Sequence, residues 1–153
     1  MTVSVQIEDF DVGAQLNQLR LASPSIGALV SFVGQVRDIN DGDSINTLTL
    51  EHYPGMTESA LQAIEAEAKS RWDILDSLII HRVGALKPLD QIVLVAVVSA
   101  HRGEAFNACE FIMDYLKTQA PFWKKEATTQ GERWVDAKLS DDLALRQWQK
   151  IKT

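Results

Sequence analysis

Residues 117–126, Lys-Thr-Gln-Ala-Pro-Phe-Trp-Lys-Lys-Glu, combine cations with large aromatic rings around a proline. Three lysines and one glutamate give this segment a local charge of +2, while the whole chain is at −6. Because proline breaks a helix, Lys117 and Lys124 cannot lie two turns apart on one helix. The chain can fold back at Pro121 so that both amines converge, and a lysine against the neighbouring rings is partly desolvated, which favours its neutral, basic form. The alternative is a solvated charge run.

A second candidate group is Ser99-Ala-His-Arg-Gly103, which follows the most apolar stretch of the chain and opens a predicted helix. The end of a strand beside a helix N-terminus is a favourable place for an anion. His101 can donate a hydrogen bond or a proton, and Arg102 can grip a phosphate in bidentate fashion. The alternative is a His-Arg pair that closes a loop against a nearby carboxylate.

Arg37 ends another apolar stretch, after Gly34-Gln-Val36, and Gly34 predicts a close approach of the backbone to a ligand. The alternative is an ordinary arginine in solvent at a strand end. Together these stretches supply five polar side chains at predicted element ends, a set that suits a phosphorylated or otherwise anionic small substrate: Arg37, His101, Arg102, Lys117 and Lys124.

The remaining candidates favour structural roles. Cys109 falls on the apolar stripe of its predicted helix, so a buried, inert thiol is expected. His52 and His81 lie within predicted strands. Met113 and Tyr115 are expected in the core or in a pocket wall rather than at a cofactor.

Composition excludes several classes of protein. The 153 residues predict one domain over 1–153, and 46% hydrophobic residues suffice for a core. The sequence has no apolar run of about 18 residues and no signal-peptide pattern, so neither a membrane span nor secretion is expected. A single cysteine without zinc-type spacing favours a reducing cytoplasm and no metal site. The acidic balance argues against nucleic-acid binding. Neither GxGxxG nor a P-loop motif occurs, which disfavours nucleotide cofactors.

Hydrophobic periodicity predicts the elements that position these residues. Strands are expected at 3–7, 28–36, 47–53, 78–83, 92–98 and 134–139. Helices are expected from an Asp11 cap to about Leu21, after a Thr57 N-cap through about Trp72, over 103–117, and from Ser140 onward. Residues 38–43 and 84–90 are predicted as loops. Helices and strands alternate irregularly with two hairpins, which indicates an α+β fold with a mixed, largely antiparallel sheet.

Four stretches resemble one known family, the catalytic (large) subunits of molybdopterin synthase. They are Phe32-Val-Gly-Gln-Val-Arg37, Leu50-Glu-His-Tyr-Pro-Gly-Met56, Ser99-Ala-His-Arg102 and the long segment from Phe111 to Glu126. The match runs from about Ala28 to Val135 with order and spacing intact, while the first 25 residues and the last helix match loosely.

The resemblance implies an α/β-hammerhead fold with a small β subdomain and a homodimer. Each protomer would bind one small ubiquitin-like sulfur carrier, giving a heterotetramer. The carrier's C-terminal Gly-Gly thiocarboxylate would deliver two sulfurs in succession to cyclic pyranopterin monophosphate, forming molybdopterin, the dithiolene ligand of the molybdenum cofactor.

Carried over by position, the resemblance makes Lys117 and Lys124 the catalytic lysines. The substrate pocket would also include, partly through backbone groups of the first two, Gln35, Val36, Arg37, His101, Arg102, Lys125 and Glu126. Lys138 stands where the family pattern has an arginine reaching toward the neighbouring protomer, and lysine lacks its fork geometry. Two other functions stay open: a non-catalytic docking module for a ubiquitin-like protein, and a phosphate-ester hydrolase using His101.

Overall fold

The computed structural model describes residues 2–40, 42–135 and 139–149. In chain order its elements are β1 (Thr2–Gln6), α1 (Val12–Arg20), β2 (Ala28–Gln35), β3 (Ile39–Asn40), β4 (Asp43–His52), α2 (Met56–Arg71), β5 (Asp76–Arg82), β6 (Gly84–Leu86), β7 (Gln91–Ser99), α3 (Arg102–Gln119), β8 (Phe122–Thr128), β9 (Gly131–Val135) and α4 (Leu139–Gln149).

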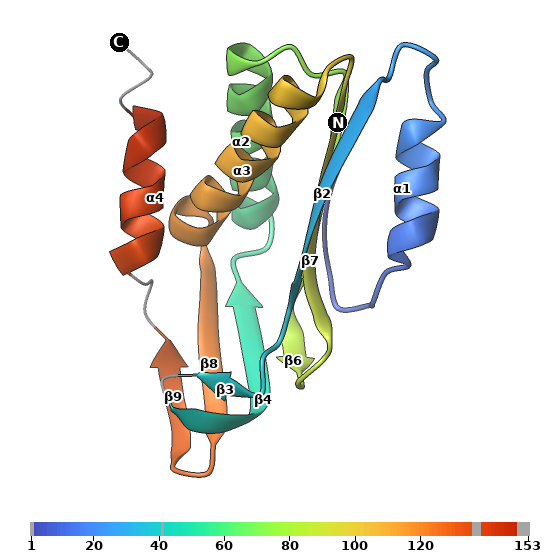
Figure 1. Ribbon diagram of the computed structural model, residues 1–153. Helices are drawn as coiled ribbons and strands as arrows, with labels where there is room; N and C mark the ends of the chain where they lie inside the picture. The colour runs from blue at the N-terminus through green and yellow to red at the C-terminus, as the bar shows by residue number, and fades with distance from the viewer. Residues whose placement is uncertain (1, 41, 136–138, 150–153) are drawn as a thin grey trace.

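The first sheet has the strand order β1-β5-β7-β2. Strand β1 runs parallel to β5, and the other two pairings are antiparallel. Helix α1 covers one face of this sheet, while α2 and α3 cover the other (Figure 1). The predicted α+β class with a mixed, largely antiparallel sheet is confirmed.

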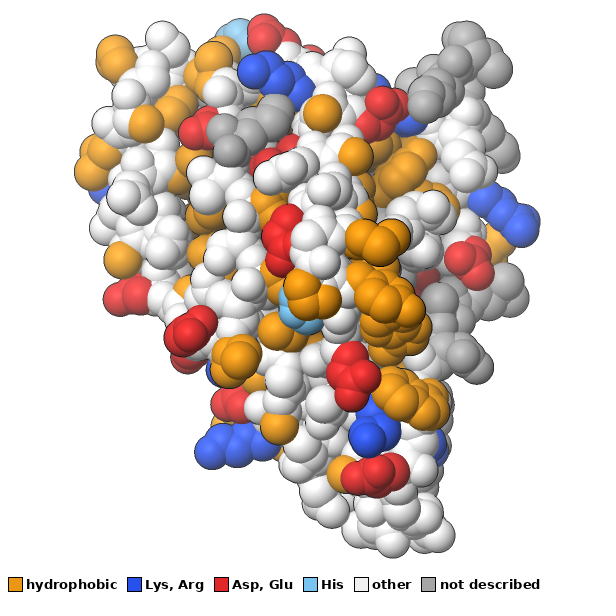
Figure 2. All heavy atoms as spheres, turned by 180° about the vertical axis from the view of Figure 1, so that it is seen from behind, with side chains coloured by type: hydrophobic (Ala, Val, Ile, Leu, Met, Phe, Trp, Pro, Cys, Tyr) orange, Lys and Arg blue, Asp and Glu red, His pale blue; other side chains and the backbone are white. Residues whose placement is uncertain are grey.

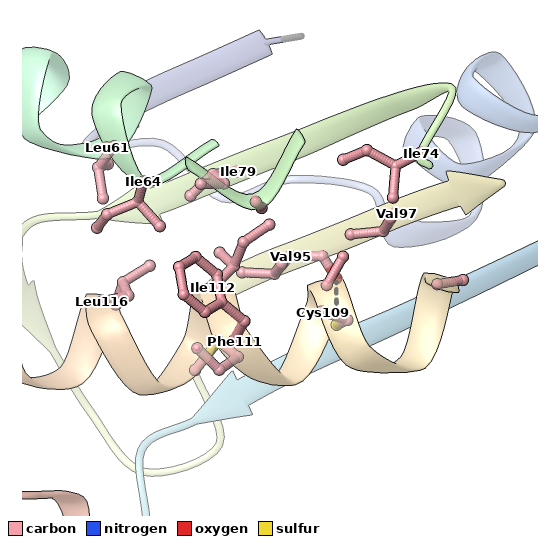
Figure 3. Packing of buried hydrophobic residues seen from close by; sticks show 14 of the residues in the cluster. Leu61, Ile64, Ile74, Ile79, Val95, Val97, Cys109, Phe111, Ile112 and Leu116 are labelled. Atoms are coloured by element: carbon pink, nitrogen blue, oxygen red, sulfur yellow. Dashed lines mark hydrogen bonds between the residues drawn. The ribbon is translucent and has the colours of Figure 1, made fainter. Parts of the chain in front are cut away.

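Central strand β7 is buried on both faces, which explains its unbroken apolar run. Val93, Val95 and Val97 pack toward α2 and α3, whereas Leu94 and Ala96 pack with residues of the α1 side. Figure 3 shows how side chains of α3 meet those of α2 and the sheet: Leu116, Ile112, Cys109, Leu61, Ile64, Ile79 and Val95.

Cys109 is part of this core, as predicted, and its thiol lies 4.0 Å from the carbonyl oxygen of Val95. Burial raises the pKa of the Cys109 thiol to about 12. The thiol therefore stays protonated at neutral pH, and it is inaccessible as a nucleophile or as a sulfur carrier.

A second sheet extends beyond the end of α3 (Figure 1). Its strand order is β3-β4-β8-β9. Strand β3 pairs with the start of β4, and β6 pairs with residues 48–50 of β4. Residues 38–43 and 84–90 were predicted as loops, but each contains a short strand, β3 and β6. Both strands are three residues or shorter and depend on pairing with β4, so local periodicity could not reveal them.

Two helix N-caps were predicted, and one of them is confirmed. Asp11 caps α1, because its Oδ1 accepts a hydrogen bond of 3.1 Å from the backbone N–H of Ala14. Thr57 as the N-cap of α2 was wrong: the cap position is Gly55, with φ of +84°, and the Thr57 hydroxyl donates to the Tyr53 carbonyl. The carboxylate of Glu58 accepts from the Gly55 N–H instead.

The C-terminal prediction was only partly right. Strand β9 begins at Gly131 and ends at Val135, earlier than the predicted 134–139, and Leu139 already belongs to α4. Helix α4 packs against α3 through Trp148, whose indole N–H donates to Asp114 Oδ2 at 2.6 Å. In the described residues no helix is both long and apolar enough to cross a membrane.

Candidate functional site

Lys117 and Lys124 line one cavity of about 390 Å³. Lys117 lies in the last turn of α3, and Lys124 lies on β8. Ala120 between them is extended, as expected for a residue before proline, and the chain re-enters as a strand at Phe122. The break at Pro121 thus turns the chain back so that both amines face the same space.

The cavity forms where four parts of the chain meet: the end of β2, the C-terminal turn of α3, the sheet of β4, β8 and β9, and the start of α4. Its polar lining comprises Gln35, Arg37, Asn40, Lys117, Thr118, Lys124, Glu126 and Asp141. Its apolar lining comprises Val36, Ile45, Leu48, Ile92, Ala120, Phe122 and Val135. Polar groups above an apolar floor suit a small molecule that combines a ring with charged substituents.

A bulge between Gly34 and Gln35 turns the end of β2 toward the cavity. A Cβ at Gly34 would meet Val93 Cγ1 at 2.9 Å, so packing against β7 already requires a glycine there, and the close approach of a ligand stays a prediction. Val36 hydrogen-bonds the loop at Leu89 and Asp90 through both its N–H and its carbonyl. Its N–H is therefore already occupied, and a backbone contact with the substrate stays a prediction.

Glu126 is a buried carboxylate held by protein groups. Its Oε1 accepts from Asn40 Nδ2 at 2.5 Å, and its Oε2 accepts from Arg133 Nε and Nη2 at 3.2 and 3.1 Å. Because Arg133 offsets the charge of Glu126, the described lining keeps Arg37, Lys117 and Lys124 against the carboxylate of Asp141. Among the described residues the site is net positive, in an acidic protein.

His81 lies behind the cavity wall. Its ring stacks on Phe122 with centroids 3.8 Å apart, and its Nδ1 lies 2.8 Å from the Arg82 carbonyl. Burial, together with the positive charges of Lys124 and Lys117, lowers the pKa of His81 to about 3. The histidine is neutral at physiological pH, and its structural role is as predicted.

Lys125 points away from the cavity, since side chains alternate along β8. Its Nζ lies 3.5 Å from Glu132 Oε2 and 5.5 Å from the centroid of Trp134. Trp123, on the same side, meets Tyr53 edge-on with ring centroids 4.5 Å apart. Figure 2, which views the molecule from behind, shows exposed hydrophobic and charged side chains close together on its lower part.

His101 and Arg102 lie at the other end of α3 from Lys117. His101 is the N-cap residue and Arg102 the first residue of the helix, and both are exposed. At 1.5 Å per residue, Arg102 and Lys117 are separated by about 22 Å along the axis. The structure of one chain therefore does not bring the two groups together. Lys138 lies outside the described residues.

Three polar lining residues, Asn40, Thr118 and Asp141, and one supporting residue, Arg133, were not predicted as site residues. Asn40 lies in a stretch predicted as a loop, and Asp141 was considered only as an acid at a helix start. Arg133 reaches the site through Glu126, a contact across the β8–β9 hairpin. The sequence holds no local signal for Asn40 or Arg133, because strand pairing sets their partners, and Asp141 reaches the cavity through the placement of α4.

The described residues include no cluster of three or more metal-ligating side chains. Within the same described part of the chain, the cavity offers three cations, two of them lysine amines that can donate or accept protons. Such a set can bind an anion, draw in an anionic chain terminus and stabilise charge that develops during a group transfer.

Comparisons with known proteins show which family the chain belongs to. The family model described as MoaE protein matches residues 5–119. The molybdopterin synthase catalytic subunit of Ralstonia nicotianae is 63% identical over 147 residues, covering 96% of this chain and 84% of the relative.

Solved structures also match. The molybdopterin biosynthesis MoaE protein from Burkholderia ambifaria superposes with a TM-score of 0.83 at 58% identity, over 97% of each chain. A complex of subunits 1 and 2 of the molybdopterin-converting factor from Helicobacter pylori matches with a TM-score of 0.73, over 89% of this chain and 91% of that one. At 19% identity this last likeness shows the shared fold alone. By the family model and by the close relatives, the chain belongs to the MoaE protein family, the family of molybdopterin synthase catalytic subunits.

Proposed function

We propose that the protein converts cyclic pyranopterin monophosphate to molybdopterin with sulfur from a small ubiquitin-like carrier. The observation that carries this proposal is the cavity that Lys117 and Lys124 share with Arg37. In each transfer, the thiocarboxylate sulfur displaces an oxygen from a carbon of the pterin side chain, and water then hydrolyses the resulting thioester to leave the carrier as a carboxylate. The displaced oxygen leaves as water or, where the cyclic phosphate opens, stays on the phosphate, so atoms and electrons balance.

The cations have separate tasks in this reaction. Arg37 binds the anionic part of the pterin. Lys117, at the exposed end of α3, receives the thiocarboxylate tail and contacts its terminal carbonyl. Lys124, deeper on β8, moves protons on the pterin side. The roles of the two lysines can be exchanged without altering the rest of the proposal.

The carrier is proposed as a partner because the described part of the chain holds no accessible thiol. Cys109 is buried with a raised pKa, so sulfur must arrive from outside. The structure from Helicobacter pylori is a complex of two subunits, which is the kind of assembly this reaction needs. A cytoplasmic location belongs to the same proposal, and the lone buried thiol suits a reducing compartment.

His101 and Arg102 enter the proposal only through a second copy of the chain. They are too far from the cavity of their own chain, yet they are exposed at a helix N-terminus that suits an anion. In the proposed homodimer, a second copy supplies them to the pterin. Mixing an Arg102→Ala protein with a Lys117→Ala protein should then restore activity in the mixed dimer. A mixed sample no more active than its parents would remove these two residues from the site.

Reconstitution tests the function itself. The purified protein is mixed with thiocarboxylated carrier and cyclic pyranopterin monophosphate, and dithiolene product is measured. Lys117→Ala should lower turnover by at least about 100-fold, the usual loss when a group that stabilises developing charge at a carbonyl is removed, while the variant still binds the carrier. Near-normal product from Lys117→Ala would refute the assignment.

The same assay separates the two other candidate functions. A docking module would bind the carrier and leave the pterin unchanged. A hydrolase acting through His101 would cleave simple phosphate esters without any carrier, and no pocket-lining residue lies next to His101 in the chain. The cavity at the far end of α3 favours the synthase over both.

A further inference from the structure

Asn40 connects three parts of the cavity wall. It is the last residue of β3, is 7% exposed, and lines the cavity. Its Nδ2 donates to Glu126 Oε1 at 2.5 Å, and its backbone carbonyl accepts from Arg133 Nη2 at 2.9 Å. Its Oδ1 faces Arg37, whose Nη2 lies 3.5 Å away, a long contact. The Asn40 side chain thus adds a link between the β3–β4 hairpin and the β8–β9 hairpin, which the β4–β8 ladder already joins.

The polarity of these contacts fixes the orientation of the amide. An ionised carboxylate only accepts hydrogen bonds, and a guanidinium only donates them. Between Glu126 and Arg37, the side chain at position 40 must therefore donate on one side and accept on the other. Asparagine meets both requirements in a single orientation, with its oxygen toward Arg37.

Arg133 locks the other end of this chain of contacts. It donates to Glu126 through two nitrogens and to the Asn40 carbonyl, so neither residue can rotate without losing a charge-assisted bond. Arg37 itself is exposed and carries a long, flexible side chain. Holding such a side chain in place before the ligand arrives lowers the entropy cost of binding.

We propose that Asn40 is a positioning residue that holds the Arg37 guanidinium at the cavity wall, through its link to the Glu126–Arg133 pair, and so sets the affinity for the anionic part of the substrate. This inference rests on the proposed function for the identity of that substrate. The positioning itself concerns the unliganded protein and can be measured without turnover.

Exchanging donors and acceptors tests the proposal. Glu126→Gln places an amide N–H opposite Asn40, so the Asn40 amide must flip and turn its own N–H toward Arg37. The KM for the pterin should rise about tenfold, the weight of a charged hydrogen bond. The double variant N40D/E126Q has the same total charge as the wild type. Its carboxylate accepts from both neighbours, and KM should return to within about threefold.

Arg37 shows whether the effect is one of positioning. In an Arg37→Ala background, Glu126→Gln should change KM by less than about twofold, because the group that Asn40 orients is gone. The midpoint of thermal unfolding should still fall by the same amount in both backgrounds. A merely structural role would instead raise KM equally with and without Arg37, and that result would overturn the proposal.

A measurement without substrate keeps the test independent of the proposed function. Proton exchange of the Arg37 guanidinium, followed by NMR in the unliganded protein, should be faster in Glu126→Gln and slow again in N40D/E126Q. Equal exchange in all three proteins overturns the positioning role. A wild-type protein that makes no dithiolene product, but shows this exchange pattern, would disprove the proposed function and leave the positioning intact.

Discussion

Strands β7 and β8 belong to different sheets and use their side chains in different ways. In β7, residues Val93 to Val98 are all buried, and alternate side chains enter separate cores on the two faces of the sheet. In β8, Lys124 and Glu126 face the cavity, whereas Trp123 and Lys125 face outward. Strand β7 lies in the protein core and carries no ionisable side chain. Strand β8 forms part of the cavity wall and carries charged side chains on both faces.

The first sheet and its helices therefore provide most of the stability of the protein, whereas the second sheet provides the side chains of the candidate site. Substitutions in the first sheet and its helices should alter the free energy of unfolding. Substitutions on the cavity side of the second sheet should alter turnover. Substitutions in each sheet can therefore test whether stability and turnover depend on different residues.

Phe111→Ala should have the largest effect. Phe111 is fully buried on α3 and touches Trp72, Tyr115 and Trp148. Removing its ring leaves a cavity and should lower the free energy of unfolding by about 3–5 kcal/mol. Phe106→Ala, on an exposed face of the same helix, is the matched control and should cost well under about 1 kcal/mol. Urea denaturation measures both, and equal losses would contradict this account of the core.

A comparison of Lys124→Ala with Lys125→Ala tests whether only the cavity-facing side of β8 takes part in the reaction. The two residues are adjacent, but only Lys124 lines the cavity. Lys124→Ala should lower turnover by about 100-fold with little change in unfolding. Lys125→Ala removes only an exposed ion pair with Glu132 and a contact with Trp134, worth under about 1 kcal/mol. Comparable losses of dithiolene formation in the two variants would mean that the outward face also takes part.

The same two strands show what the sequence could and could not predict. The apolar run of β7 identifies a central strand without any knowledge of its neighbours. Strand β8 was missed, because Phe-Trp-Lys-Lys-Glu has a charge run where a strand normally alternates, and the strand forms by pairing with β4. The convergence of Lys117 and Lys124 could be predicted from Pro121 alone. The separation of His101 from them could not, since it depends on the length and direction of α3.

His81 links the two regions, and its titration should appear in the stability of the protein. Its pKa is lowered from 6.5 to about 3. Between these values, the unfolded chain binds a proton that the folded protein does not. The contribution of His81 to the free energy of unfolding should therefore fall as the pH drops from about 6.5 to 3, by up to about 1.4 kcal/mol per pH unit. His81→Gln should lose this slope in urea titrations, and an unchanged slope would mean that His81 is protonated in the fold.

Glu65 provides the opposite slope from inside the first region. It is buried on α2, where its Oε2 accepts from the Ser77 hydroxyl at 2.5 Å, and burial raises its pKa from 4.5 to about 7. Between these values the folded protein holds a proton that the unfolded chain has lost. The contribution of Glu65 to the free energy of unfolding should therefore fall as the pH rises through this window.

Between pH 4.5 and 6.5 the contributions of Glu65 and His81 oppose each other and nearly cancel. The wild type should be almost flat there with respect to these two groups. Glu65→Gln should become more stable relative to the wild type as the pH rises, because only the His81 slope remains. His81→Gln should become less stable relative to the wild type as the pH rises, because only the Glu65 contribution remains. Since all other groups are shared, the differences between the three urea titrations isolate these two residues. Two variants that tilt in the same direction would show that one of the two pKa shifts has the wrong sign.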